Sequence, residues 1–280
     1  GYPAADGGEK IFEAFPEQAQ GYEGGFRLGG VKMFLDGSPQ SRTAWMRTPY
    51  LGSEDCGYPV LTDEQVYEYT AAAVKSGRQI LAHCNGDGAA DQYLRALSRL
   101  KEEGAHPEAV RPVMIHAQLL GLDQIPQLKR LGVIPSFFVA HVYHWGDTHI
   151  RNFGRERASR ISPAASAGKA GLLYTFHQDA PVIRPDMMET VWCAVNRRTR
   201  AGELLGAEER VTAAEALYAV TAAAAYQYRE EGEKGTLTPG KREDLVILDQ
   251  NPLKTDPRHL RQIRVLETIK DGTTIFKRKE

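Results

Sequence analysis

Five short apolar runs alternate with helical patterns along most of this chain, and they restrict its fold more than any other feature. Each run is almost continuously hydrophobic, which is typical of a strand buried on both faces of a parallel sheet. The runs cover residues 30–35, 79–83, 112–116, 133–139 and 172–176. The helical patterns between them cover 63–76, 88–103 and 122–131. This alternation predicts an α/β fold with a parallel sheet.

The alternation ends after the fifth run, and the character of the chain changes twice. Helices are expected at about 185–200 and 212–227, the second opened by a capping box of Thr212 and Glu215. From residue 235 onward, short strand patterns are separated by Pro-Gly and Asp-Gly turns. We therefore expect two units, a larger one over residues 1–234 and a small β unit over 235–280.

Composition excludes several classes of protein and partner. With 35 Lys and Arg against 36 Asp and Glu in 280 residues, the chain has no basic excess that would favour nucleic acid or an anionic membrane. Its three cysteines, Cys56, Cys84 and Cys193, are too few and too scattered for a disulfide framework. No apolar stretch has the length of a spanning helix, and the first residues lack a signal-peptide pattern. A cytoplasmic protein with a small-molecule partner is expected.

Ionisable residues recur at the ends of the strand-like runs. His83 and His116 end the second and third runs, while His141 and Asp179 follow the fourth and fifth. Catalytic groups gather at the carboxyl ends of parallel strands, and two imidazoles with a carboxylate suit Zn²⁺ or a similar ion. Each residue alone also fits a hydrogen-bonded structural role at a strand end, so both interpretations stay open. The other histidines are read as surface or loop residues: His106, His144, His149 and His259.

Lys32 lies inside the apolar run VKMFL, where a buried ammonium group is costly unless it is paired or modified. One interpretation is an ion pair with the nearby Asp36 or Glu54. The other is an uncharged amine that reacts with CO₂ to form a carbamate able to bridge two metal ions.

Five segments, in this order and spacing, resemble the amidohydrolase superfamily, in particular the branch of N-substituted formamide deformylases and exoenzyme regulatory proteins. GGVKMFLDGSPQSRTAWMRTPY resembles the fourth-strand lysine segment, ILAHCNGDGAAD the fifth-strand histidine, and RPVMIHAQ the sixth-strand histidine. FHQDAPV is similar to the eighth-strand aspartate segment, and PGKREDLVILDQNPL to the return into a small β-sandwich.

The resemblance implies strands 4 to 8 of a (β/α)8 TIM barrel followed by a C-terminal β-sandwich segment. It implies a hydrolase that cleaves an amide, formamide or cyclic amide C–N bond by metal-activated water, with one or two divalent ions, zinc being expected. Lys32 would be a carbamylated bridging ligand, His83 and His116 further ligands, and Asp179 both a ligand and the general base. His177 departs from the small residue more usual there, and with His141 it would line the substrate pocket.

The family also carries an HxH pair on its first barrel strand, and this sequence contains no HxH. Five strands do not close an eight-stranded barrel, so we expect the C-terminal part of a protein of about 500 residues. An N-terminal segment of the same protein, or a homo-oligomer partner, would then complete the site, and the chain would be inactive alone. Two alternatives stay open: a non-catalytic binding or regulatory fragment, and a complete doubly wound α/β domain whose histidines bind a ligand.

Overall fold

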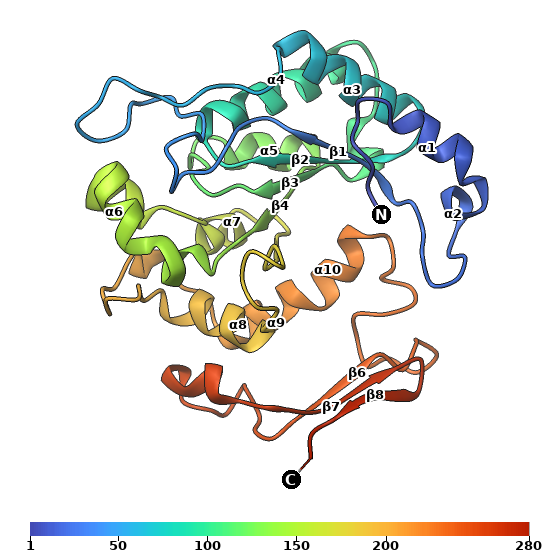
Figure 1. The fold of residues 1–280 in the computed structure, drawn as a ribbon, viewed down its shortest axis with the longest axis vertical. Coiled ribbons are helices and arrows are strands. Elements are labelled where there is room, and N and C mark those ends of the chain that lie inside the picture. Colours follow the sequence, from blue (N-terminus) through green and yellow to red (C-terminus); the bar gives the residue numbers. More distant parts are fainter. Residues whose placement is uncertain (280) are drawn as a thin grey trace.

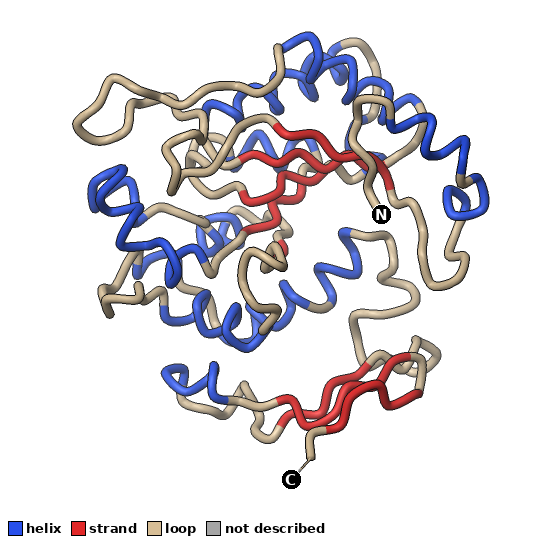
Figure 2. Tube along the Cα trace, in the orientation of Figure 1, coloured by secondary structure: helices blue, strands red, loops and turns tan. Residues whose placement is uncertain are grey.

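The computed structural model describes residues 1–279, and its centre is a parallel sheet of five strands (Figures 1 and 2). The strands follow one another in space in chain order, so each pairs only with its neighbours in sequence. They are β1 (Gly30–Phe34), β2 (Gln79–Cys84), β3 (Val113–His116), β4 (Ile134–Phe137) and β5 (Thr175–Phe176). The predicted α/β fold with a parallel sheet is confirmed.

Helices connect successive strands, and α3, α4 and α5 lie along one face of the sheet (Figure 1). The capping box that opens α3 is present, with Thr62 and Gln65 each bonded to the other's backbone. The helices are α1 (Gly8–Ala14), α2 (Pro16–Gln20), α3 (Asp63–Lys75), α4 (Asp87–Glu102), α5 (Ile125–Leu131), α6 (His141–Ser159), α7 (Ala164–Lys169), α8 (Met187–Asn196), α9 (Ala213–Val220) and α10 (Ala222–Gln227). Short 3₁₀ turns are η1 (Pro107–Val110), η2 (Ala207–Glu209) and η3 (Pro257–Gln262). None of the helices within residues 1–279 combines the length and apolar character needed to cross a membrane.

The two faces of the sheet have separate cores, because side chains alternate along each strand. The face toward the helices contributes Met33, Ile80 and Met114 to the main core. The opposite face carries a smaller cluster of Leu81, Val113, Ile115 and Ile134. Lys32 is in register with Leu81, so it belongs to this second face.

Helix α6 is a structure that the sequence did not predict. The chain enters it directly after β4, and it runs for 19 residues with a kink at Gly154. His144 and His149, expected at the surface or in loops, both lie in this helix, where His144 is half-buried and His149 is fully buried. Those two expectations were wrong, because a polar-looking segment here packs its histidines against aromatic neighbours instead of solvent.

Two predicted elements are shorter than expected. The fifth strand keeps only two paired residues of the predicted 172–176. The predicted helix 212–227 begins with its capping box but breaks at Thr221, where φ is −123° and ψ is −89°. The Thr221 hydroxyl donates to the carbonyl of Leu217, but Thr70 makes the same bond to Val66 within the unbroken helix α3, so this bond does not explain the break.

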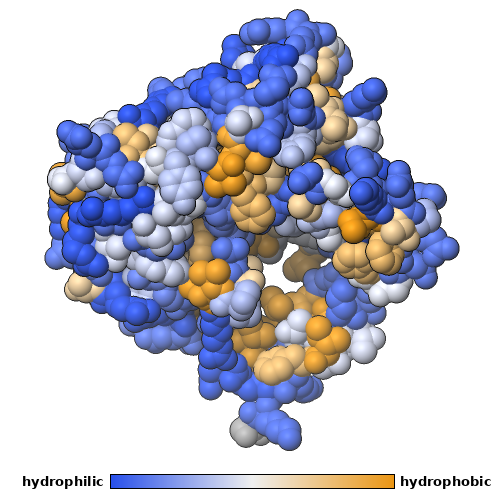
Figure 3. Space-filling view, turned by 45° about the horizontal axis from the view of Figure 1, so that its top comes forward, coloured by the Kyte–Doolittle hydropathy of each residue, from blue (hydrophilic) through white to orange (hydrophobic). Residues whose placement is uncertain are grey.

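Residues near the C-terminus form a separate antiparallel sheet of β6 (Leu245–Leu248), β7 (Val265–Lys270) and β8 (Thr273–Lys277). The predicted Asp-Gly turn joins β7 to β8, with positive φ at both Asp271 and Gly272, as tight hairpins require. Next to this sheet η3 packs on α8, where the Trp192 indole donates to the carbonyl of Arg258 at 3.1 Å. In the space-filling view, apolar side chains rim a hollow in the surface (Figure 3).

Candidate metal centre

Three imidazoles stand in a line across the carboxyl ends of β2, β3 and β5. Nδ1 of His83 lies 3.1 Å from Nε2 of His116. The other ring nitrogen of His116, Nδ1, lies 3.1 Å from Nε2 of His177. The structure therefore brings together His83 and His116, as expected from their strand-end positions, and adds His177 to them.

Both ends of this imidazole line have hydrogen-bond partners. At one end the Ser136 hydroxyl is 3.0 Å from Nδ1 of His177. At the other end Nε2 of His83 is 3.2 Å from the carbonyl oxygen of Gly37, and the Asn85 amide nitrogen is 3.0 Å from the same ring nitrogen. Sequence reasoning missed Ser136, although a polar residue inside an apolar strand is a usable signal.

Burial keeps the three rings neutral. It lowers the pKa of His83, and it lowers the pKa of His116 well below its ordinary value, with the neighbouring His177 and His83 acting in the same direction. Burial, followed by the charge of Lys32, lowers the pKa of His177 to about 3. Neutral imidazoles have free lone pairs, which is the form that binds metal ions.

Two of the candidate residues have strained backbones. His116 has a φ of 74° and Asp179 a φ of 52°, both in the left-handed region that non-glycine residues rarely adopt. By alternation along β3, His116 would share the helix-side face with Met114. Its ring lies instead between His83 and His177. Strain of this kind concentrates at functional sites.

Asp36 joins the loop after β1 to the loop after β2. Its carboxylate accepts backbone N–H bonds from Trp45 at 3.0 Å, Asn85 at 2.9 Å and Gly86 at 2.8 Å. Burial raises the pKa of Asp36 to about 7, while these N–H groups act in the opposite direction. The carboxylate thereby fixes the backbone beside His83.

Lys32 forms neither of the ion pairs that the sequence suggested. Asp36 is occupied by backbone N–H groups, and within residues 1–279 no salt bridge involves Lys32 or Glu54. The Lys32 amine lies 5.0 Å from the centre of the Phe34 ring, and the side chain is half-buried. Its charge lowers the pKa of all three imidazoles in the line, so the amine is near them.

Asp179 is close to the imidazole line but not bonded to it. Its side chain is half-buried, and its negative charge raises the pKa of His83. In the described part of the chain no hydrogen bond or ion pair involves its carboxylate. The structure therefore places Asp179 on the same side of the sheet without bringing it into contact with a predicted ligand.

His141 is not part of the line. It begins α6, where it is buried, and its Nδ1 lies 3.1 Å from Nε2 of His149 with the two rings stacked. The Phe138 ring contacts both His141 and His177, with centroid distances of 4.7 and 5.4 Å.

The donor pair fits a divalent ion in distance and protonation. Two nitrogens that each lie about 2.0–2.1 Å from one tetrahedral ion are about 3.3 Å apart, close to the 3.1 Å between His83 and His116. Among residues 1–279, however, no group of three or more His, Cys, Asp or Glu side chains is arranged to hold an ion. The geometry therefore provides one facing pair of nitrogen donors, fewer than a group of three.

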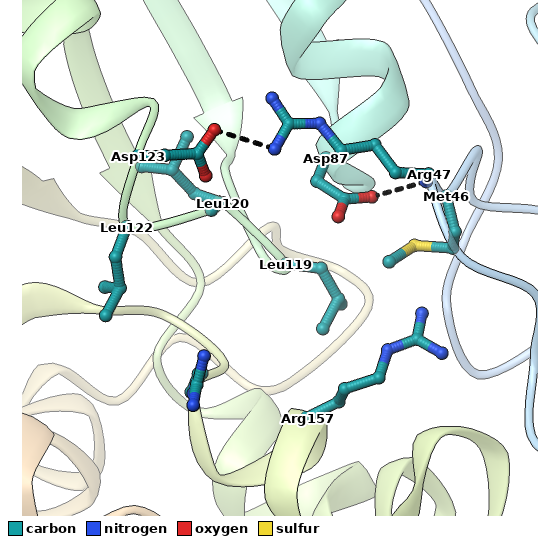
Figure 4. A pocket seen from close by; sticks show the side chains of 10 residues that line it. Met46, Arg47, Asp87, Leu119, Leu120, Leu122, Asp123 and Arg157 are labelled. Carbon is teal, nitrogen blue, oxygen red and sulfur yellow. Dashed lines mark hydrogen bonds and ion pairs between the residues drawn. The ribbon is translucent and has the colours of Figure 1, made fainter.

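A cavity of about 390 Å³ lies between the loops that follow the first three strands and helix α6 (Figure 4). Arg47 spans part of it, with its backbone donating to Asp87 and its side chain to Asp123, each at 2.8 Å. Arg157 faces the cavity from α6. None of the three imidazoles lines this cavity, so it is separate from the candidate metal centre.

The fold and site define an α/β protein whose parallel sheet carries, at its strand ends, an imidazole pair with metal-ligand spacing. The model of the amidohydrolase family matches residues 6–276. The chain belongs to the amidohydrolase family.

Named relatives and a solved structure agree with this assignment. The chain is 28% identical to the N-substituted formamide deformylase of Arthrobacter pascens over 76% of its own length and 39% of the relative's. It is 31% identical to the protein LONG AFTER FAR-RED 3 of Arabidopsis thaliana, over 80% of this chain and 39% of that protein. A metal-dependent hydrolase of Pyrococcus horikoshii superposes with a TM-score of 0.77 at 27% identity, over 92% of this chain and 51% of that one. The chain thus spans less than half the length of these curated relatives.

Proposed function

We propose that this chain is the C-terminal part of a metal-dependent hydrolase that cleaves the C–N bond of an amide, formamide or cyclic amide. The observation that carries the proposal is the facing pair of neutral imidazoles, His83 and His116, at the strand ends of an amidohydrolase fold. The likeness to a relative named N-substituted formamide deformylase supports the choice of a C–N bond.

The five parallel strands would be strands 4 to 8 of a (β/α)8 barrel. Their sequential order fits an arc of such a barrel, and five strands are too few to close it. Residues 1–234 would form this part of the barrel and residues 235–280 a segment of a β-sandwich. An N-terminal segment of the same protein, or a second copy, would supply the remaining strands.

His83 and His116 would hold a divalent ion, with zinc as the expected metal, and Lys32 as a carbamate and Asp179 would be further ligands. The N-terminal segment or the second copy would supply the rest of the ligand set. When bound, the ion would supply Lewis acidity toward the substrate carbonyl and toward water. Asp179 would accept a proton from the attacking water and pass it to the leaving nitrogen, which yields a carboxylic acid and an amine. His141, whose ring packs on Trp145, would line the substrate pocket.

The partners expected from the sequence remain part of the proposal. The substrate would be a small amide-type molecule, and neither nucleic acid nor a membrane would be a partner. The protein would act in the cytoplasm, where its cysteines, free in this structure, would stay reduced.

The test is metal-dependent turnover of a panel of N-formyl amines, N-acyl amines, cyclic amides and esters. Complete protein that includes the N-terminal segment, loaded with Zn²⁺ or Co²⁺, is compared with chelated protein and with protein to which the metal has been returned. We expect the wild-type protein to hydrolyse a substrate of this panel. Chelation should abolish this activity and added metal should restore it, and the double variant His83→Ala/His116→Ala should have none. Turnover unaffected by chelation would contradict the proposal, and a metal content well below one ion per chain would favour a non-catalytic binding fragment.

A further inference from the structure

His177 has both ring nitrogens engaged by the protein. Nε2 faces Nδ1 of His116 and Nδ1 faces the Ser136 hydroxyl, at 3.1 and 3.0 Å. Ser136 is buried in β4, in register with Thr175 of β5, and this pairing sets its hydroxyl beside the residue that follows β5. A ring with both nitrogens occupied has none left for a substrate, so lining the substrate pocket does not account for this histidine.

The direction of these hydrogen bonds decides whether His116 can bind a metal ion. A neutral imidazole carries one proton, so Nε2 of His116 is free toward His83 only when the proton is on Nδ1. Nδ1–H of His116 then points at Nε2 of His177, and this nitrogen must accept the hydrogen bond. His177 in turn carries its proton on Nδ1 and donates to the Ser136 oxygen, which is able to accept.

We propose that His177, backed by Ser136, is a positioning residue that holds His116, in the metal-loaded protein, in the tautomer whose Nε2 binds the metal ion. This inference rests on the proposed function, because it assumes that His83 and His116 bind an ion. Hydrogen-bond partners of metal-binding histidines typically set the tautomer and the orientation of the ring.

A hydroxyl is suited to the end of this line because it both donates and accepts. With Ser136 as donor, the protons of His177 and His116 sit on their Nε2 atoms, and Nε2–H of His116 points at Nδ1 of His83. Every contact is then filled without an ion. With Ser136 as acceptor, the direction of each hydrogen bond reverses. The lone pair on Nε2 of His116 then faces the lone pair on Nδ1 of His83. The same three contacts therefore serve the protein with and without metal.

Binding of Zn²⁺ by the full chain tests the proposal through two pairs of variants. His177→Phe keeps a ring and removes both nitrogens, whereas His177→Gln keeps an oxygen able to accept from His116. Ser136→Ala removes the hydroxyl, and Ser136→Thr keeps it. We expect the Zn²⁺ dissociation constant to rise about 10- to 100-fold in His177→Phe and by less in Ser136→Ala. His177→Gln and Ser136→Thr should keep much of the Zn²⁺ affinity that these two variants lose.

The matched control is His149→Phe, which replaces another imidazole, here a fully buried one, by phenylalanine and has no contact with the line. Its Zn²⁺ affinity should equal that of the wild type. If His177→Phe fails to fold, the pair Ser136→Ala and Ser136→Thr still tests the proposal, since both substitutions are far smaller changes than the loss of an imidazole ring.

A spectroscopic measurement separates positioning from a general packing effect. In zinc-loaded protein labelled with ¹⁵N-histidine, long-range ¹H–¹⁵N correlations should show the proton of His177 on Nδ1 and that of His116 on Nδ1. A proton on Nε2 of His177 in the loaded protein would overturn the inference.

The two proposals fail differently. Wild-type protein that binds no Zn²⁺ would overturn the proposed function and this inference with it. Wild-type protein that binds Zn²⁺, together with an equal affinity in His177→Phe, would overturn only the positioning role and leave the metal-dependent hydrolase in place.

Discussion

Nδ1 of His83 and Nε2 of His116 face each other at 3.1 Å, although 33 positions separate the two residues in the chain. The parallel register of β2 and β3 sets Cys84 opposite His116, so the two histidines end adjacent strands almost level with each other. The left-handed backbone at His116 accompanies a ring that lies beside His83 and His177. This pair is the basis of the first prediction.

Replacing either histidine by alanine should remove most of the divalent-metal binding. His83→Ala and His116→Ala each delete one of two facing ligands. We expect the affinity for Co²⁺ or Zn²⁺ to fall by more than about 100-fold, which exceeds the effect of losing a hydrogen-bond partner of a ligand. Metal per chain after dialysis, by elemental analysis, is the measurement. His106→Ala is the control, since that side chain is 80% exposed. Unchanged metal content in both ligand variants would refute the site.

Lys32 should carry a carbamate in the metal-loaded protein. Its amine is half-buried without an anionic partner in the described chain, and a carbamate would give it two oxygens that bind metal. Protein incubated with ¹³C-bicarbonate and metal should show a carbamate carbon signal that Lys32→Ala lacks and that Lys101→Ala keeps. Lys32→Ala should also lose metal and activity together, and short carboxylic acids should restore part of both. An unmodified Lys32 in a high-resolution map of the metal-loaded protein would contradict the prediction.

Asp179→Asn should lower kcat in the complete enzyme by about 10²- to 10⁴-fold while KM changes little, because the carboxylate acts as a base mainly in the transition state. Steady-state kinetics on the substrate found by screening, with metal content measured in parallel, tests this. The matched control is Asp186→Asn, whose side chain caps α8 by accepting from Met188 and Glu189, a role that asparagine also fills. Near wild-type turnover of Asp179→Asn with metal fully bound would mean that another group moves the proton.

His149 should make the fold sensitive to acid. The side chain is fully buried, and burial lowers its pKa to about 4, below the ordinary value of 6.5. The unfolded chain therefore takes up a proton first as the pH falls. The stabilisation present above pH 6.5 is lost progressively toward pH 4, by up to about 3 kcal/mol.

The measurement is urea denaturation of wild type and His149→Phe at several pH values between 7 and 4. The variant should lose less stability on acidification than the wild type, with His141, its buried neighbour, still contributing. His106→Phe, at an exposed position, should follow the wild type. Parallel curves for wild type and His149→Phe would show that this imidazole does not control the acid response.

Local patterns predicted much of the fold because the signals that start and stop elements are short-range. The capping boxes at Thr62 and Thr212 and the turn at Asp271 depend on residues within a few positions of each other. The same locality explains the failures. The helix break at Thr221 carries none of these signals, and α6 has polar residues that look like a loop although Phe138 and Phe153 pack against its histidines.

The sequence by itself determined that strands alternate with helices and that His83 and His116 end neighbouring strands, since apolar runs mark buried strands and their ends mark one edge of the sheet. Only the tertiary structure decided which ring nitrogens face each other, that Ser136 stands behind His177, that Lys32 lacks the expected ion pair, and that His141 pairs with His149. The reason is that ring orientation depends on strand register, backbone angles and contacts between distant segments. A one-dimensional pattern places a residue at a strand end but does not specify the neighbours that its atoms meet.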